Sequence, residues 1–340
     1  MNDMRKTLRR LAMTSKHPKV YEIYMNAVKE IRFRLGAMRQ ARTLHTEIEE
    51  LRESNAILQR ATQKNNHQSN SIKPDNIVWI FGTGRSGSSW LWRMLVSQRE
   101  CVGWNEPYAG VMFPPLQAAT NLREREATIF GNSHRQAWNE SLKAMFLRCA
   151  ASRFPEMDSD SYLIVKEPNG SAGAPWLAEA VPESRIIVLA RDPRDVVASA
   201  IDSVKPGAWR TYSNESQMTL QQLTRKRAET YFQQMSASLE AYEKHDGLKS
   251  IVTYEELIED TLHHMSRLCY ELDLPITSDL RNSVEKHSWS NVPENRKGEG
   301  KAMRKATPGS WRDDLTEEQV AIIEEITSPL LDKLGYVRAT

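Results

Sequence analysis

A short apolar run leads into a glycine-rich turn and then a helical stretch, and this order constrains the fold most strongly. Residues 77–81, IVWIF, are followed by GTGRSGSS and then by WLWRML. Glycines let a backbone curl closely around a bound group, and the start of the following helix aims free N–H groups at an anion. The segment predicts a strand–loop–helix unit that binds phosphate, although a glycine-rich turn also arises by chance.

Further apolar, β-branched runs alternate with helical stretches along the chain, which is typical of a parallel sheet covered on both faces. The predicted strands are residues 77–81, 162–166, 185–190 and 251–254, and the predicted helices begin at Ser89, Asp192 and Glu255, the last ending at Leu272. We therefore expect an α/β fold with a central parallel sheet flanked by helices.

The chain has 340 residues, enough for one large α/β domain or two ordinary ones. Residues 61–75 are polar and contain a proline near their end, the composition of a linker. We expect three parts: a helical or coiled-coil N-terminal extension at 1–60, a linker at 61–75 and the α/β domain at 76–340.

The N-terminal extension is basic and has a helical repeat. Residues 1–43 hold eleven Lys and Arg against three acids, a net charge of +8. Apolar residues recur every three or four positions from Tyr24 to Leu58, and Asn55 falls on the seam, where a polar residue fixes coiled-coil register. A helical hairpin, a coiled-coil homodimer and a helix packed on the α/β domain all satisfy this pattern. The basic charge also suits peripheral contact with an anionic membrane or an acidic glycan.

Charge, cysteine usage and hydropathy exclude several classes of protein. The formal net charge is only +2, so we expect no nucleic-acid partner. Cys101, Cys149 and Cys269 lie far apart without metal-ligand spacing, which argues against a disulfide framework or a zinc site. No run approaches the roughly 20 apolar residues of a membrane span, and the start lacks the apolar core of a secretory signal. We expect a soluble, cytoplasmic protein without a metal.

The glycine-rich loop departs from the nucleoside-triphosphate pattern GxxxxGK followed by Ser or Thr, in which Lys reaches the β- and γ-phosphates. Ser88 stands at the Lys position, and Arg85 places a cation within the loop instead. We therefore expect a phosphate ester of another shape, while a P-loop kinase or NTPase remains the alternative enzyme.

The loop GTGRSGSSWL resembles the 5′-phosphosulfate loop of sulfotransferases that use 3′-phosphoadenosine 5′-phosphosulfate (PAPS), in the Arg-containing form of carbohydrate and tyrosylprotein sulfotransferases. The resemblance implies a P-loop nucleotide-binding type of fold and no requirement for Mg²⁺. It also implies that the donor contacts Gly84, Arg85, Ser86, Gly87, Ser88 and Ser89.

Two further segments resemble the family's 3′-phosphate motifs. In RIIVLARDPRDVVASAIDS, a strand-end Arg191 and a helical Ser199 two turns later are able to converge on one phosphate, although RDPRD also reads as a capped, solvated helix start.

RKATPGSW at 304–311 resembles RKGxxGDW, which implies 3′-phosphate contacts from Arg304 and Lys305. Ala306 and Ser310 depart from that pattern, and RKG at 296–298 is a competing copy of it. A loop rich in Lys and Arg is also often mobile surface.

Tyr254 matches a family position that contacts the adenine, and packing in the core is the alternative role of this side chain.

The catalytic groups follow from the same resemblance. Sulfuryl transfer resembles phosphoryl transfer, in which positioned cations stabilise the leaving group. Arg85 and Lys166 are the candidates for these cations. A lysine at a strand end also commonly extends its ammonium group to solvent, which is the alternative for Lys166. The sequence lacks the His that follows the matching Lys in phenol and steroid sulfotransferases. Glu106, in WNEPY, is the candidate general base, and we expect its apolar neighbours to raise its pKa. The alternative interpretation of Glu106 is an ordinary glutamate of a surface loop. Glu167 is the second candidate for the general base.

We expect the acceptor pocket to be formed by residues 109–153 and 203–224, with Trp138, Trp209 and Tyr212 as aromatic walls. The sequence as a whole predicts transfer of a sulfuryl group from PAPS, with PAP as product, to an acceptor hydroxyl of a carbohydrate or glycolipid-like substrate. A non-catalytic phosphate-binding interaction protein is the third alternative.

Overall fold

The computed structural model describes residues 72–113, 127–205, 207–208, 218–276, 279–301 and 303–339. All of them belong to the second of the two units into which the chain divides, residues 70–340. The predicted extension at 1–60, with its coiled-coil, homodimer and membrane-contact interpretations, lies outside the described residues, as do most of the 61–75 linker, Trp209 and Tyr212.

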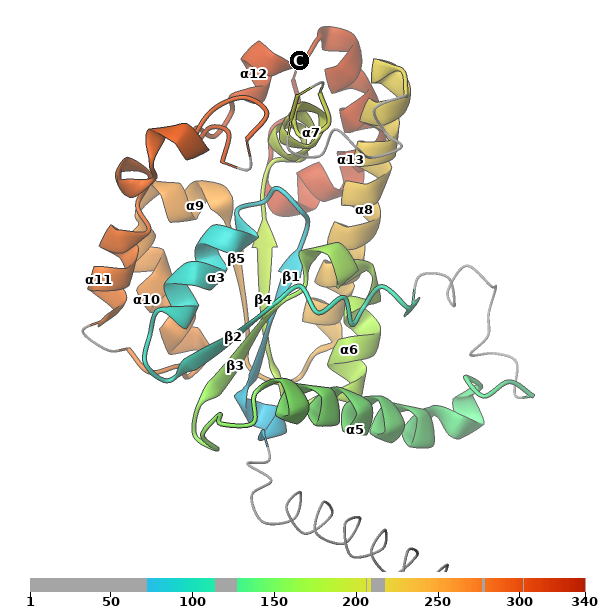
Figure 1. The fold of residues 1–340 in the computed structure, drawn as a ribbon. Helices are drawn as coiled ribbons and strands as arrows, with labels where there is room; N and C mark the ends of the chain where they lie inside the picture. The colour runs from blue at the N-terminus through green and yellow to red at the C-terminus, as the bar shows by residue number, and fades with distance from the viewer. Residues whose placement is uncertain are drawn as a thin grey trace, which may run out of the picture. The chain divides into compact units, whose positions relative to one another are not determined.

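A parallel sheet of five strands forms the centre of the fold, in the order β2-β3-β1-β4-β5, as Figure 1 shows. The strands are β1 Ile77–Gly82, β2 Cys101–Asn105, β3 Tyr162–Lys166, β4 Arg185–Ala190 and β5 Lys249–Thr253. The predicted α/β class with a central parallel sheet is confirmed. Strand β2 was not predicted, since CVGWN contains a single β-branched residue and a glycine.

Helices cover both faces of the sheet (Figure 1). The α-helices are α3 Ser88–Val96, α5 Arg135–Arg153, α6 Ala174–Ala180, α7 Pro193–Asp202, α8 Leu220–Lys244, α9 Tyr254–Glu259, α10 Thr261–Glu271, α11 Asp279–Lys286, α12 Trp311–Asp314 and α13 Glu317–Leu334. Short 3₁₀ helices are Pro74–Asn76, Asn132–His134, Pro168–Gly173, Trp289–Asn291 and Glu294–Arg296.

The core lies on both faces of β1, because alternate side chains of a strand point in opposite directions. Trp79 and Phe81 pack in one apolar cluster with residues of α5, α6 and α8, whereas Val78 and Ile80 pack in another with residues of α3 and α10. All six residues of β1 are buried, which explains why its sequence is a continuous apolar run rather than an alternating one.

The single helix predicted at 255–272 is two helices, α9 and α10. They are separated at Asp260, whose non-helical backbone ends α9 and whose side chain accepts the N–H of His263 at 3.0 Å. An aspartate in this position caps the next helix, so the helical repeat continues along the sequence while the helix axis breaks.

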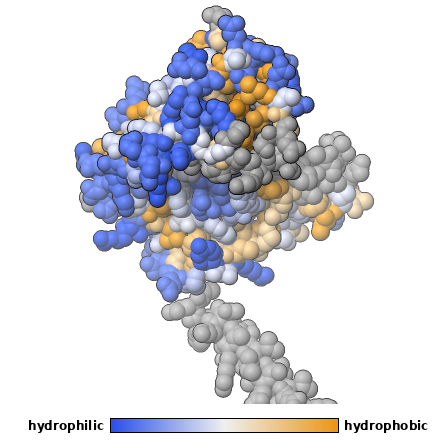
Figure 2. Space-filling view, turned by 45° about the horizontal axis from the view of Figure 1, so that its top comes forward, coloured by the Kyte–Doolittle hydropathy of each residue, from blue (hydrophilic) through white to orange (hydrophobic). Residues whose placement is uncertain are grey.

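Parallel strands bring their carboxyl ends to one edge of the sheet, so the loops after all five strands meet there. Figure 2 turns this edge toward the viewer, and hydrophilic residues cover its left side, where Figure 1 places α9, α10 and α11. Within the described part of the chain, no helix is both long and apolar enough to cross a bilayer.

Candidate functional site

A large cavity, about 1290 Å³ in volume, opens at the carboxyl edge of the sheet. Each of the five strands is followed by residues that line it. They are Thr83, Gly84, Arg85, Gly87, Ser88 and Ser89 after β1, Glu106 and Tyr108 after β2, Asn169 after β3, Arg191 after β4, and Tyr254 after β5. The sheet therefore gathers into one cavity residues that are far apart in the sequence.

The glycine-rich loop follows β1 and contains two residues with left-handed backbones. Gly87 has φ +93°, and a Cβ there would lie 2.6 Å from the ring of Tyr254, so the position requires glycine. Arg85 has φ +71°, which a non-glycine residue adopts only when its surroundings hold it. Its Nε donates to Ser199 Oγ at 3.0 Å, and its carbonyl accepts from Arg191 Nη1 at 3.1 Å. The loop is thus fixed to the end of β4 and to α7.

Helix α3 begins at Ser88, directly after the loop, with Gly87 as its N-cap residue. The first amides of a helix have no partner within it, so they present donors and a positive dipole end to the cavity. Ser89 Oγ accepts from Lys166 Nζ at 2.8 Å. Ser86 differs from its neighbours: it is fully buried, and its hydroxyl donates to the Thr83 carbonyl at 2.7 Å within the loop.

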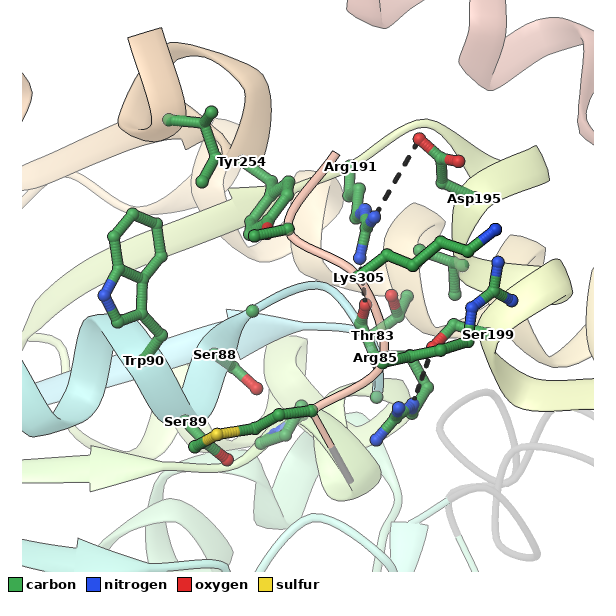
Figure 3. Close-up of a pocket in the computed structure, with 18 of the residues that line it drawn as sticks. Thr83, Arg85, Ser88, Ser89, Trp90, Arg191, Asp195, Ser199, Tyr254 and Lys305 are labelled. Atoms are coloured by element: carbon green, nitrogen blue, oxygen red, sulfur yellow. Dashed lines mark hydrogen bonds and ion pairs between the residues drawn. The ribbon is translucent and has the colours of Figure 1, made fainter. Parts of the chain in front are cut away.

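A second group of cations lines the same cavity: Arg191 at the end of β4, with Arg304 and Lys305 from the loop before α12. Figure 3 shows Arg191, Lys305, Arg85 and Ser199 on one side of the cavity and Ser88, Ser89 and Trp90 on the other. Arg304 and Lys305 both form ion pairs with Asp314. Burial lowers the pKa of Arg304, with the charge of Asp202 opposing this effect and that of Arg191 adding to it.

Some buried polar atoms at this cavity lack a hydrogen-bond partner within the described part of the chain. Among the described residues, Arg191 Nε and Thr83 Oγ1 have no hydrogen-bond acceptor or donor. The Arg191 guanidinium lies 4.2 Å from the ring centroid of Tyr254, which orients it across the top of the loop. Buried donors are normally satisfied, so an anionic ligand in the cavity fits this arrangement.

Glu106 lines the cavity and pairs with the buried Lys166, which is not itself a lining residue; the register that aligns Asn105 of β2 with Lys166 of β3 brings the two together. Lys166 Nζ lies 2.6 Å from Glu106 Oε1. Glu106 Oε2 accepts from Asn169 Nδ2 at 3.0 Å and from the Tyr108 hydroxyl at 3.1 Å. Glu106 has φ +52°, a strained backbone that these contacts hold.

The expectation that the pKa of Glu106 is raised is wrong. Burial does act in that direction, but the hydrogen bond and charge of Lys166, together with hydrogen bonds from Tyr108 and Asn169, outweigh it and hold the pKa below its ordinary value. Burial is the largest single effect on this pKa, but the polar contacts together, led by those of a lysine 60 residues away, outweigh it. Glu106 is consequently ionised at neutral pH.

Lys166 and Glu167 are adjacent in sequence but occupy different surroundings. Lys166 is 3% exposed and reaches Ser89 and Glu106 from beneath the loop. Glu167 is buried outside the cavity wall, and its burial raises its pKa to about 7 against the opposing backbone hydrogen bonds of Gly110, Ala109 and Tyr108. The reserve base is therefore not among the residues that face the cavity.

The predicted aromatic acceptor wall is wrong for Trp138. Its ring packs edge-on against Trp176 and Phe113, at centroid distances of 4.9 and 5.8 Å, and belongs to the core beneath α5. The described wall near Glu106 comes instead from α8, through Arg227, Thr230, Tyr231 and Gln234. Their spacing of three and four residues places them on one helix face, a signal that is visible in the sequence.

Sequence reasoning also missed Trp90 and Asn169. Trp90 lines the cavity with its ring 5.9 Å from Tyr254, and its Nε1 donates to the His287 carbonyl at 2.8 Å. Asn169 lies near the glycine-rich loop: a Cβ added at Gly84 would approach Asn169 Oδ1 to 3.2 Å. Within the described segments, no group of three or more His, Cys, Asp or Glu side chains is placed to hold a metal ion.

Comparisons with known proteins agree with this geometry. The model of a family described as the sulfotransferase family matches residues 76–279, a span that includes Arg85, Glu106, Lys166 and Arg191 and ends before Arg304. No curated protein matches the chain.

Solved structures resemble the chain at low sequence identity. Sulfotransferase STF9 from Mycobacterium avium has a TM-score of 0.50 and 16% identity, over 77% of this chain and 77% of that one. Mouse sulfotransferase SULT7A1, complexed with PAP, has a TM-score of 0.46 and 13% identity, over 76% of this chain and 85% of that one. A retinol dehydratase bound to androsterone and inactive cofactor PAP has a TM-score of 0.45 and 16% identity, over 77% and 82%. At these identities the STF9 likeness is one of fold.

Proposed function

The chain belongs to the sulfotransferase family, and we propose that it transfers a sulfuryl group from PAPS to an acceptor hydroxyl, with PAP as product. The observation that carries this proposal is that two groups of cations and hydrogen-bond donors, both suited to anions, line one cavity. The first is the glycine-rich loop with Arg85 and the start of α3, and the second is Arg191 with Arg304 and Lys305.

Two anion-binding groups suit a nucleotide that carries phosphate at both ends of its ribose. The loop amides suit the 5′ end, where a helix start and Arg85 together favour a compact anion. Arg191 and Ser199 suit the 3′-phosphate, since a guanidinium and a hydroxyl bind adjacent phosphate oxygens. Tyr254 and Trp90 offer aromatic surfaces to a purine. Small-molecule pockets usually measure roughly 300–1,000 Å³, so 1290 Å³ leaves room for an acceptor beside the donor.

Glu106 is proposed as the general base and Lys166 as the cation nearest to it. The carboxylate of Glu106 would accept the proton of an acceptor hydroxyl, while Lys166, placed between Glu106 and Ser89, would stabilise negative charge that develops beside the loop. PAPS supplies the activated sulfuryl group. A lowered pKa makes Glu106 a weaker base but keeps it ionised and therefore available at neutral pH.

The acceptor is proposed to be polar and hydroxyl-rich, as in a carbohydrate or the sugar of a glycolipid. The wall beside Glu106 presents hydrogen-bonding groups from Tyr108, Asn169, Thr230 and Gln234, together with Arg227. Such groups bind hydroxyls in fixed orientations, whereas a flat phenol would require an apolar slot.

The proposal is tested by thermal-shift measurements on the full chain with PAP in the absence of metal and, separately, with ATP and Mg²⁺. We expect stabilisation by PAP at micromolar concentration, because a ligand that binds the folded state raises its melting temperature. Labelled PAPS and a panel of mono- and oligosaccharides then test transfer. Stabilisation by ATP and Mg²⁺ but not by PAP would assign the chain to nucleoside-triphosphate chemistry instead.

A further inference from the structure

Two aspartates of α7 bind both ends of the loop that carries Arg304 and Lys305. We call residues 303–308 of this loop the strap. After the strap, Asp195 Oδ2 accepts the Gly309 N–H at 2.7 Å, and Asp195 Oδ1 accepts the Trp311 N–H at 2.9 Å. Before the strap, Asp202 Oδ2 accepts the Gly300 N–H at 2.7 Å. The strap is therefore tied to α7 on both sides.

The ties occur where the chain turns. Gly300 has φ +68° and Gly309 has φ +76°, left-handed conformations that glycine adopts without the steric cost of a side chain. Each turn exposes a backbone N–H, and each exposed N–H meets a carboxylate of α7. The turns and the aspartates thus act together in setting the path of the strap.

Both carboxylates are buried, and this burial is itself informative. Asp195 and Asp202 are each 2% exposed. A carboxylate is costly to bury unless charges and hydrogen bonds satisfy it. Asp195 lies 3.9 Å from Arg191, and Asp202 lies 3.0 Å from Lys205, but their shortest contacts are the amides of the two glycines. Holding this loop accounts for the position of both residues.

The same face of α7 also contacts the glycine-rich loop. Asp195, Ser199 and Asp202 are separated by four and three residues, so they lie on one side of the helix. Ser199 accepts a hydrogen bond from Arg85 of the glycine-rich loop. Figure 3 shows Asp195, Ser199 and Lys305 on the same side of the cavity. This face of α7 therefore contacts both the glycine-rich loop and the loop of Arg304 and Lys305, and so fixes the position of one relative to the other.

We propose that Asp195 and Asp202 are positioning residues that hold the strap so that Arg304 and Lys305 share an anion with Arg191. The inference rests on the proposed function, since that anion is the 3′-phosphate of the nucleotide. In this inference both aspartates act through the strap, although Asp195 also lines the cavity. Trp311, packed 4.1 Å beneath the Arg194 guanidinium, anchors the start of α12 beside the Asp195 tie.

The experiment compares Asp195→Asn and Asp202→Asn with Asp313→Asn, an exposed aspartate of α12 that undergoes the same change of charge. PAP affinity is measured by titration calorimetry on the full chain. Losing a charge-assisted hydrogen bond should weaken PAP binding roughly tenfold in the first two variants, and the control should bind as the wild type does. Trypsin cleavage after Arg304 and Lys305, read by mass spectrometry, should be faster in the first two variants only.

A double-mutant comparison separates positioning from general stability. In an Arg304→Ala/Lys305→Ala background the strap has no cations to position, so Asp195→Asn should cause little further loss of PAP affinity. A residue that only stabilises the fold would weaken binding equally in both backgrounds, and that result would overturn the inference.

The remaining outcomes distinguish failure of the positioning role from failure of the proposed sulfotransferase function. Wild-type affinity for PAP in both aspartate variants overturns the positioning role and leaves the proposed function intact. No PAP binding by the wild type overturns the proposed function and, with it, the shared anion. The trypsin rates then decide whether the aspartates hold the strap at all.

Discussion

Arg85 Nε donates a 3.0 Å hydrogen bond to Ser199 Oγ, which joins the glycine-rich loop to a helix more than a hundred residues later in the chain. The bond holds Arg85 in a left-handed backbone conformation, and the Arg191 hydrogen bond to the Arg85 carbonyl adds a second constraint. Two segments that the sequence assigned to opposite ends of one nucleotide are therefore directly bonded to each other. The two segments therefore form one connected unit, and substitutions in either should affect the other.

Replacing Glu106 with Gln should reduce turnover by roughly 10²- to 10⁴-fold, because the amide keeps the shape of the side chain but does not accept a proton. PAP affinity should change little, since Glu106 lies beside the loop and not within it. Initial rates with labelled PAPS and calorimetry with PAP measure the two effects. Glu229→Gln, an exposed change on α8, is the matched control. Full activity in Glu106→Gln would remove this residue from the mechanism.

Lys166→Met should move the acidic limb of the pH–rate profile to higher pH. Burial raises the pKa of Glu106, and the hydrogen bond and charge of Lys166 lower it, so burial dominates once the lysine is removed. In the wild type, Glu106 stays ionised down to a pH below its ordinary value of 4.5. Single-turnover rates between pH 4 and 8 test the shift. An unchanged limb would show that another group controls it.

Arg191→Ala should discriminate between nucleotides. Loss of this guanidinium should weaken PAP binding by roughly 10- to 100-fold, while the weaker binding of adenosine 5′-phosphate, which has no 3′-phosphate, should change far less. Competition binding of both nucleotides provides the comparison, and Arg225→Ala, an exposed change on α8, is the control. An equal loss for both nucleotides would place Arg191 elsewhere on the ligand.

The ionisation of Glu167 should lower the free energy of unfolding as the pH rises. Its pKa in the folded protein is about 7 against an ordinary 4.5, so between these values the folded state keeps a proton that the unfolded chain has released. The free energy of unfolding then decreases through this window and levels off above it, by roughly 2 kcal/mol for this group between pH 5 and 8. Urea unfolding at both pH values should show that decrease in the wild type and its loss in Glu167→Gln. A decrease of the same size in both proteins would contradict the assignment.

Much of the fold was predictable from local pattern. Continuous apolar runs predicted β1, β3 and β4, because strands buried on both faces tolerate no polar positions. The turn with Gly84 and Gly87 predicted where an anion would bind, since glycine spacing before a helix is itself a backbone geometry. Strand β2 and the break at Asp260 were missed, because neither has a strong local signal.

The sequence alone determined which residue types are present: a glycine-rich loop with Arg85 in place of a lysine, and candidate cations at Arg191, Arg304 and Lys305. Only the tertiary structure decided their partners. The β2–β3 register placed Lys166 against Glu106 and reversed the expected pKa shift, and core packing took Trp138 away from the cavity. Chemistry at a site depends on charges and surfaces a few ångströms apart, and strand pairing sets those distances between residues that the chain itself keeps far apart.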